Sequence, residues 1–359
     1  IGGPLKDRQA WDNEVRSVTD WCILCESCKR ECPSNVDIPK MILDARARYV
    51  SAFGSSLHAR IVTRPEEAGR RLKKISKVVN PVISHPVVKR LGEQLTGVSA
   101  KRPAMTIANR SLFDAIVASS KPNGRAILYF SGCYAGYMRP EIGRAAVKLL
   151  TLAGYAVHIP PQHCCGLPMI AKGMIEPARQ QILRNLHQWG DLLKNSEALV
   201  VTCSSCGLAL MEAWATLLGE RAMAQIREKV KHISRLLLPA LSRWRFQGTP
   251  NTIYYHLPCH LKNQPDAGSS LSMLEKIEGL TVKTKETGCC GMAGAWGLHR
   301  TNDALSRRIG SGLMEAIGQS GAFHGVTDCP TCRMQMEYLG SLPVRHPVEI
   351  VAERLGTVP

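Results

Sequence analysis

The sequence predicts an α/β protein: two similar units with parallel strands, preceded by a small helical cysteine-rich module and a basic helical connector. Ten of the fourteen cysteines fall into two sets of five with nearly the same spacing. Short apolar runs alternate with helical patterns around each set, which is typical of parallel α/β folds. We expect the module at 1–53, the connector at 54–122, and the two units at 123–248 and 249–359.

A compact cysteine run, CILCESCKRECP, is the first element and contains Cys22, Cys25, Cys28 and Cys32. Its spacing, C-x2-C-x2-C-x3-C-P, matches the bacterial ferredoxin pattern, in which three thiolates bind one [4Fe–4S] cubane and the fourth serves another cluster. We therefore expect Cys32 to bind a partner cluster, or to complete this one where no partner exists. Zinc fits less well, because zinc sites pair two C-x2-C motifs.

The chain starts at Ile-Gly-Gly-Pro, without an initiator methionine. Because two-cluster ferredoxin modules carry two cysteine runs, we expect a first run upstream of Ile1. Residues 1–20 read as irregular or briefly helical. A helix is predicted from Met41 to about Phe53, directly after the cysteine run.

Positive charge is concentrated in the connector. Between Lys40 and Arg125 there are 17 Lys or Arg and 5 Asp or Glu, in a chain with a net charge of +17. Such a surface can serve nucleic acid, anionic lipid or an acidic partner. Aromatic residues make up only 5% of the chain and the basic residues alternate with apolar ones, which argues against nucleic acid. No apolar run approaches the ~18 residues of a membrane-spanning helix.

Two amphipathic helices are predicted in the connector. The first covers 65–79, begins at Pro65 and is ended by Pro81, and the second covers 86–96. The apolar face of the first consists of Ala68, Leu72, Ile75 and Val79, and its basic face of Arg70, Arg71, Lys73, Lys74 and Lys77. A basic amphipathic helix can lie on an anionic bilayer surface. Alternatively, the apolar face packs on the protein and the charges are merely solvated.

In the first unit, three apolar runs each lead into cysteines, and helical spacing separates them. We expect strands at 126–130, 156–160 and 198–202, and helices at 140–154, 177–195 and over most of 207–245. The second unit repeats this order after 125–126 residues. There we expect strands at 252–256, 280–283 and 325–327, and helices near 270–278 and at 302–318. Ligands of parallel α/β folds bind beyond the carboxyl ends of the strands, which is where the cysteines fall.

The cysteines of the two units have nearly the same spacing along the chain. The first set is Cys133, Cys164, Cys165, Cys203 and Cys206, and the second is Cys259, Cys289, Cys290, Cys329 and Cys332. Five thiols exceed the four ligands of zinc or of a simple cubane, which favours an unusual cluster whose adjacent cysteines bridge or bind two irons. Structural disulfides are disfavoured, because adjacent cysteines bridge to each other only with strain.

Other residue types near the two sets have expected roles. Close backbone approach or positive φ is expected at Gly166, Gly291, Gly294 and Gly297. Two histidines beside cysteines, His163 and His260, are candidates to hydrogen-bond a cluster or carry a proton, or are simply packed nearby. Buried walls are expected from Met169, Met292 and Trp296. The spacing of the last three glycines is not G-x-G-x-x-G, and no flavin or nicotinamide fingerprint is present.

The cysteine motifs resemble those of a known family. The first set with Gly166, and its copy in the second unit, are similar to the paired CCG domains of the heterodisulfide reductase superfamily. The stretches YHLPCHL at 255–261, GCCGMAG at 288–294 and HPVEI at 346–350 are similar to further parts of that family. The resemblance implies a [4Fe–4S] cubane cluster in the module and noncubane-type [4Fe–4S] clusters in both CCG domains.

The resemblance also implies a function: an iron–sulfur electron-transfer subunit of a membrane-associated dehydrogenase complex. Electrons would enter from a flavoprotein that oxidises a small hydroxy substrate, glycerol 3-phosphate by resemblance. They would pass through the cubane and the CCG clusters to a membrane quinone such as menaquinone. The expected location is peripheral, on anionic lipid at the cytoplasmic face of the inner membrane. A single ferredoxin run, where that family has two, is the departure from its pattern.

Two other functions stay open at this point. In the first, the CCG region is a catalytic site that cleaves a disulfide, as in heterodisulfide reductase. In the second, the chain is a non-redox subunit for membrane anchoring and assembly. The sequence itself does not give the substrate, because the flavoprotein partner would select it.

Overall fold

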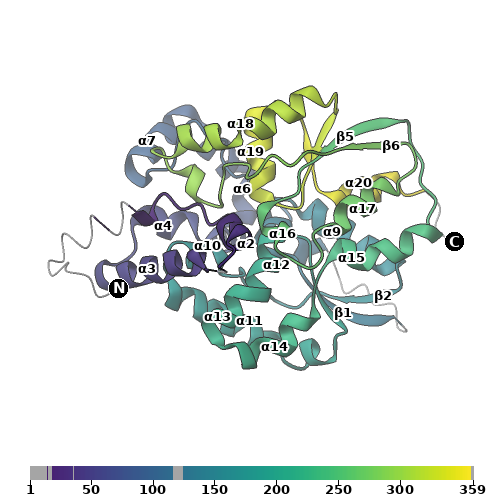
Figure 1. Ribbon diagram of the computed structural model, residues 1–359, viewed down its shortest axis with the longest axis horizontal. Coiled ribbons are helices and arrows are strands. Elements are labelled where there is room, and N and C mark those ends of the chain that lie inside the picture. The colour runs from purple at the N-terminus through teal and green to yellow at the C-terminus, as the bar shows by residue number, and fades with distance from the viewer. Residues whose placement is uncertain (1–13, 15–17, 35, 116–123, 357–359) are drawn as a thin grey trace.

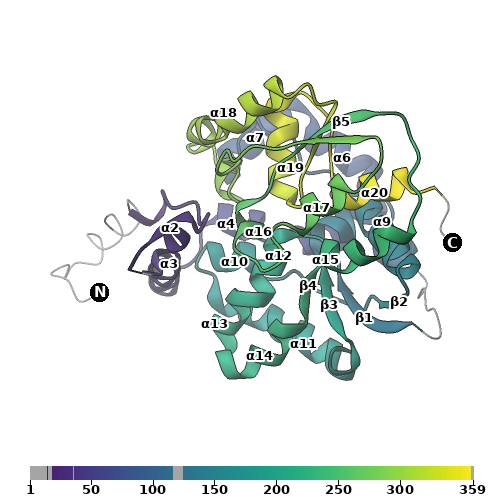
Figure 2. The same cartoon turned by 45° about the vertical axis from the view of Figure 1, so that its right-hand side comes forward.

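The computed structural model describes residue 14 and residues 18–34, 36–115 and 124–356. Two α/β units lie side by side, and helices from the first third of the chain pack along them (Figure 1). Helices α2 (Ser27–Glu31) and α3 (Ile38–Phe53) lie at one end of the molecule, opposite the two sheets, as Figure 2 also shows. The prediction for 1–20 falls almost entirely outside the described residues.

Each unit is built on a parallel sheet of four strands. The first sheet has the order β2-β1-β3-β4 and comprises β1 (Arg125–Phe130), β2 (Tyr155–His158), β3 (Ala198–Val201) and β4 (Val230–His232). The second has the order β6-β5-β7-β8 and comprises β5 (Asn251–Tyr255), β6 (Leu280–Lys283), β7 (His324–Val326) and β8 (Val344–Arg345). The matching orders confirm the predicted pair of similar α/β units.

The fourth strand of each sheet departs from the prediction. Residues 207–245 were expected to be largely helical, but β4 interrupts them and pairs with β3. Likewise, β8 pairs with β7 where no strand was expected. Strands of two or three residues are too short to show apolar alternation in the sequence, so only their neighbours in the sheet reveal them.

Helices connect the strands in both units. The first unit contains α9 (Pro140–Leu152), α10 (Leu167–Ala171), α11 (Ile175–Asn195), α12 (Ser204–Leu208), α13 (Trp214–Leu218), α14 (Glu220–Lys229) and α15 (Ile233–Leu237). The second contains α16 (Cys259–Lys262), α17 (Ser269–Glu275), α18 (Asp303–Gln319), α19 (Pro330–Gly340) and α20 (Pro347–Arg354). One turn of π-helix follows the first cysteine of the first unit, at Tyr134–Met138, and another lies at Ala209–Ala213.

The two units share one hydrophobic core. Helix α9 packs against α20, and α17 packs against α15, so that these four helices lie between the two sheets (Figure 1). Buried side chains from β1, such as Ile127, and from β5, such as Ile253, belong to the same cluster. Burial of this apolar surface is what fixes the two cysteine sets relative to each other.

The connector is more broken than predicted. It forms α4 (Leu57–Val62), α5 (Pro65–Leu72), a 3₁₀ turn (Lys73–Ile75), α6 (Ser76–Ser84), α7 (Pro86–Thr96) and α8 (Leu112–Ala115). The prediction that Pro81 ends a helix is wrong, because Pro81 lies inside α6. The helix ends instead at His85, whose extended backbone (φ −66°, ψ 132°) is the conformation that the following Pro86 imposes.

The packed face of α5 and α6 combines apolar, small and polar residues, and Ala68, Leu72 and Val79 of the predicted apolar face are half-buried there. Glu66, Gly69 and Ser76 are buried, and a Cβ placed on Gly69 would lie 2.5 Å from the Cβ of Tyr137. The glycine therefore allows α5 to approach the first unit closely. Ile75, which was expected on one apolar face with the other three residues of that face, is instead exposed.

Across the described ranges, no helix combines the length and the apolar composition that crossing a bilayer requires.

Candidate iron–sulfur centres

The cysteine loop of the module brings three of its four thiols together. Leu24 and Glu26 both adopt positive φ, 52° and 61°, so the loop curls tightly before α2 begins. The pKa of the Cys28 thiol is raised by partial burial and by the nearby thiols of Cys22 and Cys25. This is the arrangement that three ligands of one cluster require.

Cys32 is oriented differently. Its Sγ accepts a hydrogen bond from the backbone N–H of Val36 at 3.4 Å, and Pro33 follows it at the end of α2. Cys32 thus has a backbone partner of its own, while Cys22 and Cys25 lie near Cys28.

Hydrogen bonds fix the module to both α/β units. The guanidinium of Arg46, on α3, donates to the carbonyl oxygens of Thr19, Cys22 and Ala171, the last at the end of α10. From the second unit, Trp296 Nε1 donates to the carbonyl oxygen of Asp20 at 2.7 Å. The cysteine loop thus lies against the cysteine-bearing ends of both units.

The five thiols of the first set meet at the carboxyl ends of the strands. Cys133 follows β1, Cys164 and Cys165 follow β2, and Cys203 and Cys206 follow β3. Hydrogen bonds link the side chains in series, from Cys133 to Cys164, Cys165, Cys206 and Cys203. Three separate loops therefore present one continuous group of sulfur atoms.

The second set repeats this arrangement. Its side chains are linked in the same order, from Cys259 to Cys289, Cys290, Cys332 and Cys329. All fourteen cysteines lie in the described part of the chain, and each carries a free thiol. Ten crowded sulfur atoms without disulfides fit metal clusters, because thiolates are the ligands that iron–sulfur clusters use.

In both sets the pKa of the first cysteine of the Cys-Cys pair is lowered. The hydrogen bond from Cys133, and a second from Cys165, hold the pKa of Cys164 well below its usual value. The hydrogen bond from Cys259, with that from Cys290, lowers the pKa of Cys289 to about 3. A metal binds thiolate rather than thiol, so these two positions are prepared for it.

The glycines after each Cys-Cys pair have the predicted conformations. Gly166 and Gly291 have φ of 83° and 88°, and Gly294 has φ of 62°. Gly297 lacks positive φ, but a Cβ there would lie 2.6 Å from Ser306 Oγ, which confirms the predicted close approach. Backbone that turns this sharply next to the sulfur atoms exposes N–H groups to them, as the 3.3 Å bond from Gly291 N to Cys289 Sγ shows.

A cavity of about 200 Å³ joins the module to the first set. Its lining includes Cys22, the five cysteines Cys133, Cys164, Cys165, Cys203 and Cys206, and the apolar side chains of Leu43, Met105, Trp296 and Leu298. Met169 and Met292 are buried close by, as predicted. The donor set and the mostly apolar lining fit an iron–sulfur cluster.

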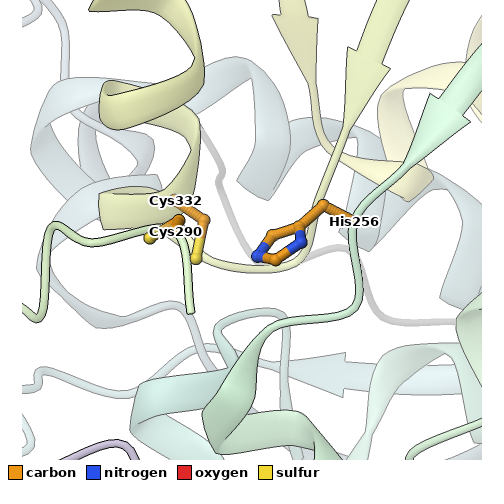
Figure 3. A group of neighbouring side chains, drawn as sticks. All are labelled: His256, Cys290 and Cys332. Atoms are coloured by element: carbon orange, nitrogen blue, oxygen red, sulfur yellow. The ribbon is translucent and has the colours of Figure 1, made fainter. Parts of the chain in front are cut away.

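A histidine that the sequence did not single out points at the second set. A ring nitrogen of His256 and the Sγ atoms of Cys290 and Cys332 all lie within 4.8 Å of one another (Figure 3). Burial lowers the pKa of His256 to about 4, so the imidazole is neutral. His256 was not predicted as a candidate, because the candidates were histidines directly beside a cysteine and His256 lies three residues before Cys259.

The two histidines chosen from the sequence lie elsewhere. His260 holds the module: Nε2 lies 3.1 Å from the carbonyl oxygen of Leu24, and Nδ1 lies 3.0 Å from Ser205 Oγ. His163 faces the connector, with Nδ1 3.7 Å from Glu66 Oε2. Both ring nitrogens of His260 have structural partners, which leaves His163 as the better placed of the two for proton exchange.

Comparison with known proteins agrees with this geometry. The family model of the cysteine-rich domain CCG matches residues 127–211 and 253–337, one match in each unit. The chain is 28% identical to a subunit of the anaerobic glycerol-3-phosphate dehydrogenase of Escherichia coli (strain K12), over 90% of this chain and 83% of that protein.

Two further relatives have different names. The glycolate oxidase iron–sulfur subunit of E. coli is 24% identical over 96% of this chain and 84% of its own length. A subunit of the dihydromethanophenazine:CoB–CoM heterodisulfide reductase of Methanosarcina barkeri is 25% identical over 64% of this chain and 59% of its own. The chain therefore carries two domains of the cysteine-rich CCG family and resembles, over nearly its whole length, one subunit of anaerobic glycerol-3-phosphate dehydrogenase.

Proposed function

We propose that the chain is the iron–sulfur electron-transfer subunit of a membrane-associated dehydrogenase complex. The observation that carries this proposal is the presence of three groups of free thiols, two of them in matching order, with the module and the first set lining one cavity. Clusters bound there would carry electrons between a partner and an acceptor. The similarity to several iron–sulfur subunits supports this function.

The ligands follow from the three groups. A [4Fe–4S] cubane would use Cys22, Cys25 and Cys28, with Cys32 completing it or serving a partner cluster. Noncubane-type [4Fe–4S] clusters would use the five thiols of each set. These are Cys133, Cys164, Cys165, Cys203 and Cys206 in the first unit, and Cys259, Cys289, Cys290, Cys329 and Cys332 in the second.

The electron donor would be a flavoprotein subunit. The sequence holds no flavin or nicotinamide fingerprint, so hydride chemistry would be performed by a partner. The name of the E. coli relative supports glycerol 3-phosphate as that partner's substrate. Of the three groups of thiols, the loop of Cys22–Cys32 is the most exposed, since Cys28 is open to solvent. This loop would therefore face the flavoprotein.

The acceptor would be a membrane quinone such as menaquinone. Apolar side chains of α6 and α7 are exposed, among them Val78, Val82, Leu91 and Leu95, and basic residues lie between them. We call the exposed face of α6 and α7 the connector surface. Exposed apolar residues beside Lys and Arg match a peripheral contact with anionic lipid, which in a bacterium would be the cytoplasmic face of the inner membrane.

A second cavity, of about 460 Å³, lies between the connector and the first set. Leu112, Phe113 and Tyr137 form an apolar wall, and Glu66, Arg70 and His163 provide polar groups. Arg70 Nε lies 3.2 Å from Glu66 Oε1, and His163 is covalently next to Cys164. A pocket with both apolar and polar walls, one residue from Cys164, has the chemistry that a quinone ring with its two oxygens needs.

The test begins with protein purified without oxygen. About twelve irons with matching acid-labile sulfide are expected, for three four-iron clusters. A quinone analogue should then perturb a cluster signal in the EPR spectrum of the reduced protein. A signal that responds only to a disulfide or thiol would favour the heterodisulfide reductase-like alternative, and protein without any reducible cluster would favour a non-redox anchoring subunit.

The cavity gives this test a matched pair of variants. Arg70→Met should weaken the effect of the quinone analogue, because Arg70 lines the cavity. Arg71→Met removes the neighbouring arginine, which pairs with Glu67 on the exposed side of α5, and should leave the effect intact. Equal effects of the two variants would show that the quinone analogue does not bind in this cavity.

A further inference from the structure

The second cysteine set has a nitrogen donor that the first set lacks. His256 follows β5 directly, and its backbone N–H donates to the carbonyl oxygen of Val326 at 2.9 Å, which fixes the residue beside the ends of two strands. A ring nitrogen then lies within 4.8 Å of the Sγ atoms of both Cys290 and Cys332 (Figure 3). The imidazole is therefore held where a ligand of the second set would lie.

The imidazole is buried with one nitrogen unpaired. His256 is 2% exposed, and its Nε2 has no hydrogen-bond partner among the described residues. Leaving a buried polar nitrogen unpaired costs on the order of 1–3 kcal/mol. The nearby His346 shows the usual solution, since its Nε2 lies 2.8 Å from the carbonyl oxygen of Thr202. His256 has thiols beside it instead of such an acceptor.

We propose that His256 is a nitrogen donor to the cluster of the second set, through Nε2 bound to iron. This assignment rests on the proposed function, because it requires a cluster at the thiols of Cys290 and Cys332. Neutral imidazole is a common iron ligand and occurs beside thiolates in iron–sulfur proteins. The donor set of the second unit is then five thiolates and one imidazole.

The first unit provides an internal comparison. The residue three positions before its first cysteine is Phe130, which is fully buried and packs edge-to-face on Trp189 with ring centroids 5.5 Å apart. A phenyl ring offers no donor atom at that position. The two sets therefore have nearly the same cysteine spacing but differ at one equivalent position. The second set has a donor atom there, in His256, and the first set has Phe130.

The difference has an electronic consequence. Imidazole is neutral, so an iron that it binds carries less negative charge around it than an iron bound by a further thiolate. Lower negative charge at a cluster raises its reduction potential. The repeat thus yields two electronically distinct centres, and His256→Cys, which supplies an anionic ligand at the same position, is expected to lower the potential of the second.

The test is pulsed EPR of the reduced, anaerobically purified chain, with iron and labile sulfide measured on the same samples. The wild-type protein should show a strong ¹⁴N coupling from a bound imidazole. His256→Phe, which copies the first unit, should lose that coupling. His260→Gln, beside Cys259 but bonded to Ser205 and Leu24, should keep it.

Each result bears on one proposal. Full clusters without an imidazole coupling in the wild-type protein would overturn the assignment of His256 and leave the proposed function standing. Protein that holds neither iron nor sulfide would overturn the proposed function itself. If His256→Phe loses iron from the second set, His256→Cys should restore iron without the nitrogen coupling, whereas a purely structural role predicts no such rescue.

Discussion

Equivalent residues in the two units show how the repeat has diverged. Tyr129 and Tyr255 each lie four residues before the first cysteine of their set. In the first unit the Tyr129 hydroxyl lies 3.0 Å from Thr202 Oγ1. In the second, Tyr255 donates to the carboxylate of Asp328 at 2.7 Å. A neutral pair has become a charge-assisted one, which is the stronger kind of hydrogen bond.

Asp328 is the centre of a buried polar network, and this leads to a prediction. Its carboxylate also accepts from Ser270 at 2.8 Å, so Asp328→Ala leaves two buried hydroxyls without an acceptor. At about 1–3 kcal/mol for each, we expect the free energy of unfolding to fall by about 2–6 kcal/mol. The midpoint of chemical denaturation measures this, and Thr202→Ala, at the equivalent position, should cost less. An unchanged midpoint would mean that the desolvation of the carboxylate cancels its hydrogen bonds.

His58 predicts a dependence of stability on pH. It joins the connector to the second unit, with Nδ1 3.0 Å from the carbonyl oxygen of Thr96 and its ring edge-on to His299. Burial, with Lys172 and His299 nearby, lowers its pKa from 6.5 to about 4. The folded state favours the neutral ring, so its contribution to stability is present above pH 6.5 and is lost as the pH falls toward 4.

We therefore expect His58→Phe to lose less stability than the wild-type protein between pH 7 and about 4.5. Thermal unfolding across this range measures the difference. His187→Phe, at an exposed position of α11, is the control and should follow the wild-type curve. Parallel curves for all three proteins would contradict a role for His58 in acid sensitivity.

At the scale of elements, the sequence predicted strands where apolar runs lead into cysteines. The strands β1, β3 and β5 lie within one or two residues of those runs, because a buried central strand needs several consecutive apolar residues. The edge strands β4 and β8 were not predicted, since their positions depend on pairing with β3 and β7 and not on their own composition. Each sheet has two edge strands, and the sequence predicted one of them, β2 or β6, but missed the other.

The connector shows the same limit for helices. Periodicity predicted helices in 65–79 and 86–96, and helices form there. The mistaken end at Pro81 followed from treating proline as a helix stop, whereas the residue before the next proline, His85, is where the helix ends. The close approach of Gly69 to Tyr137 was not predicted, because this tertiary contact has no apolar signature in the sequence.

The connector surface gives a prediction about lipid. Val82→Asp with Leu91→Asp places charges on exposed apolar positions of α6 and α7, and should reduce binding to vesicles that contain anionic lipid by several-fold. Co-sedimentation at low salt measures the effect. Leu183→Asp, at a similarly exposed apolar position of α11, should leave binding unchanged. Equal losses would show that any exposed leucine suffices, and unchanged binding in the double variant would remove α6 and α7 from the membrane contact.

For the whole molecule, the repeat explains how the two units pack on each other. Helix α9 packs on α20 as α17 packs on α15, and these two contacts are equivalent, because α9 corresponds to α17 and α20 to α15 in the order of the two units. The spacing of the cysteines predicted that each set would assemble. It carried no information on the position of the module, which follows from the hydrogen bonds of Arg46 to Ala171 and of Trp296 to Asp20, or on the orientation of His256, whose neighbours are distant in sequence.

The position of the module predicts what its loss would do. Arg46 holds three carbonyl oxygens, at Thr19, Cys22 and Ala171, with bonds of 2.6–2.7 Å. Arg46→Met would leave these acceptors without their donor and free the cysteine loop from α10. We expect the EPR signal of the module's cluster to weaken or disappear, because its ligand loop loses its support, while the iron of the two cysteine sets stays in place.

Arg48→Met is the matched control, since Arg48 is an exposed residue of the same helix and should keep all signals. Electron transfer from a chemical or flavoprotein donor to the two sets should slow in the Arg46 variant alone. Two results would contradict this account: loss of every cluster together, which would mean that the chain folds as one cooperative whole, or full retention of the module's signal, which would mean that the loop is held by its cluster and not by Arg46.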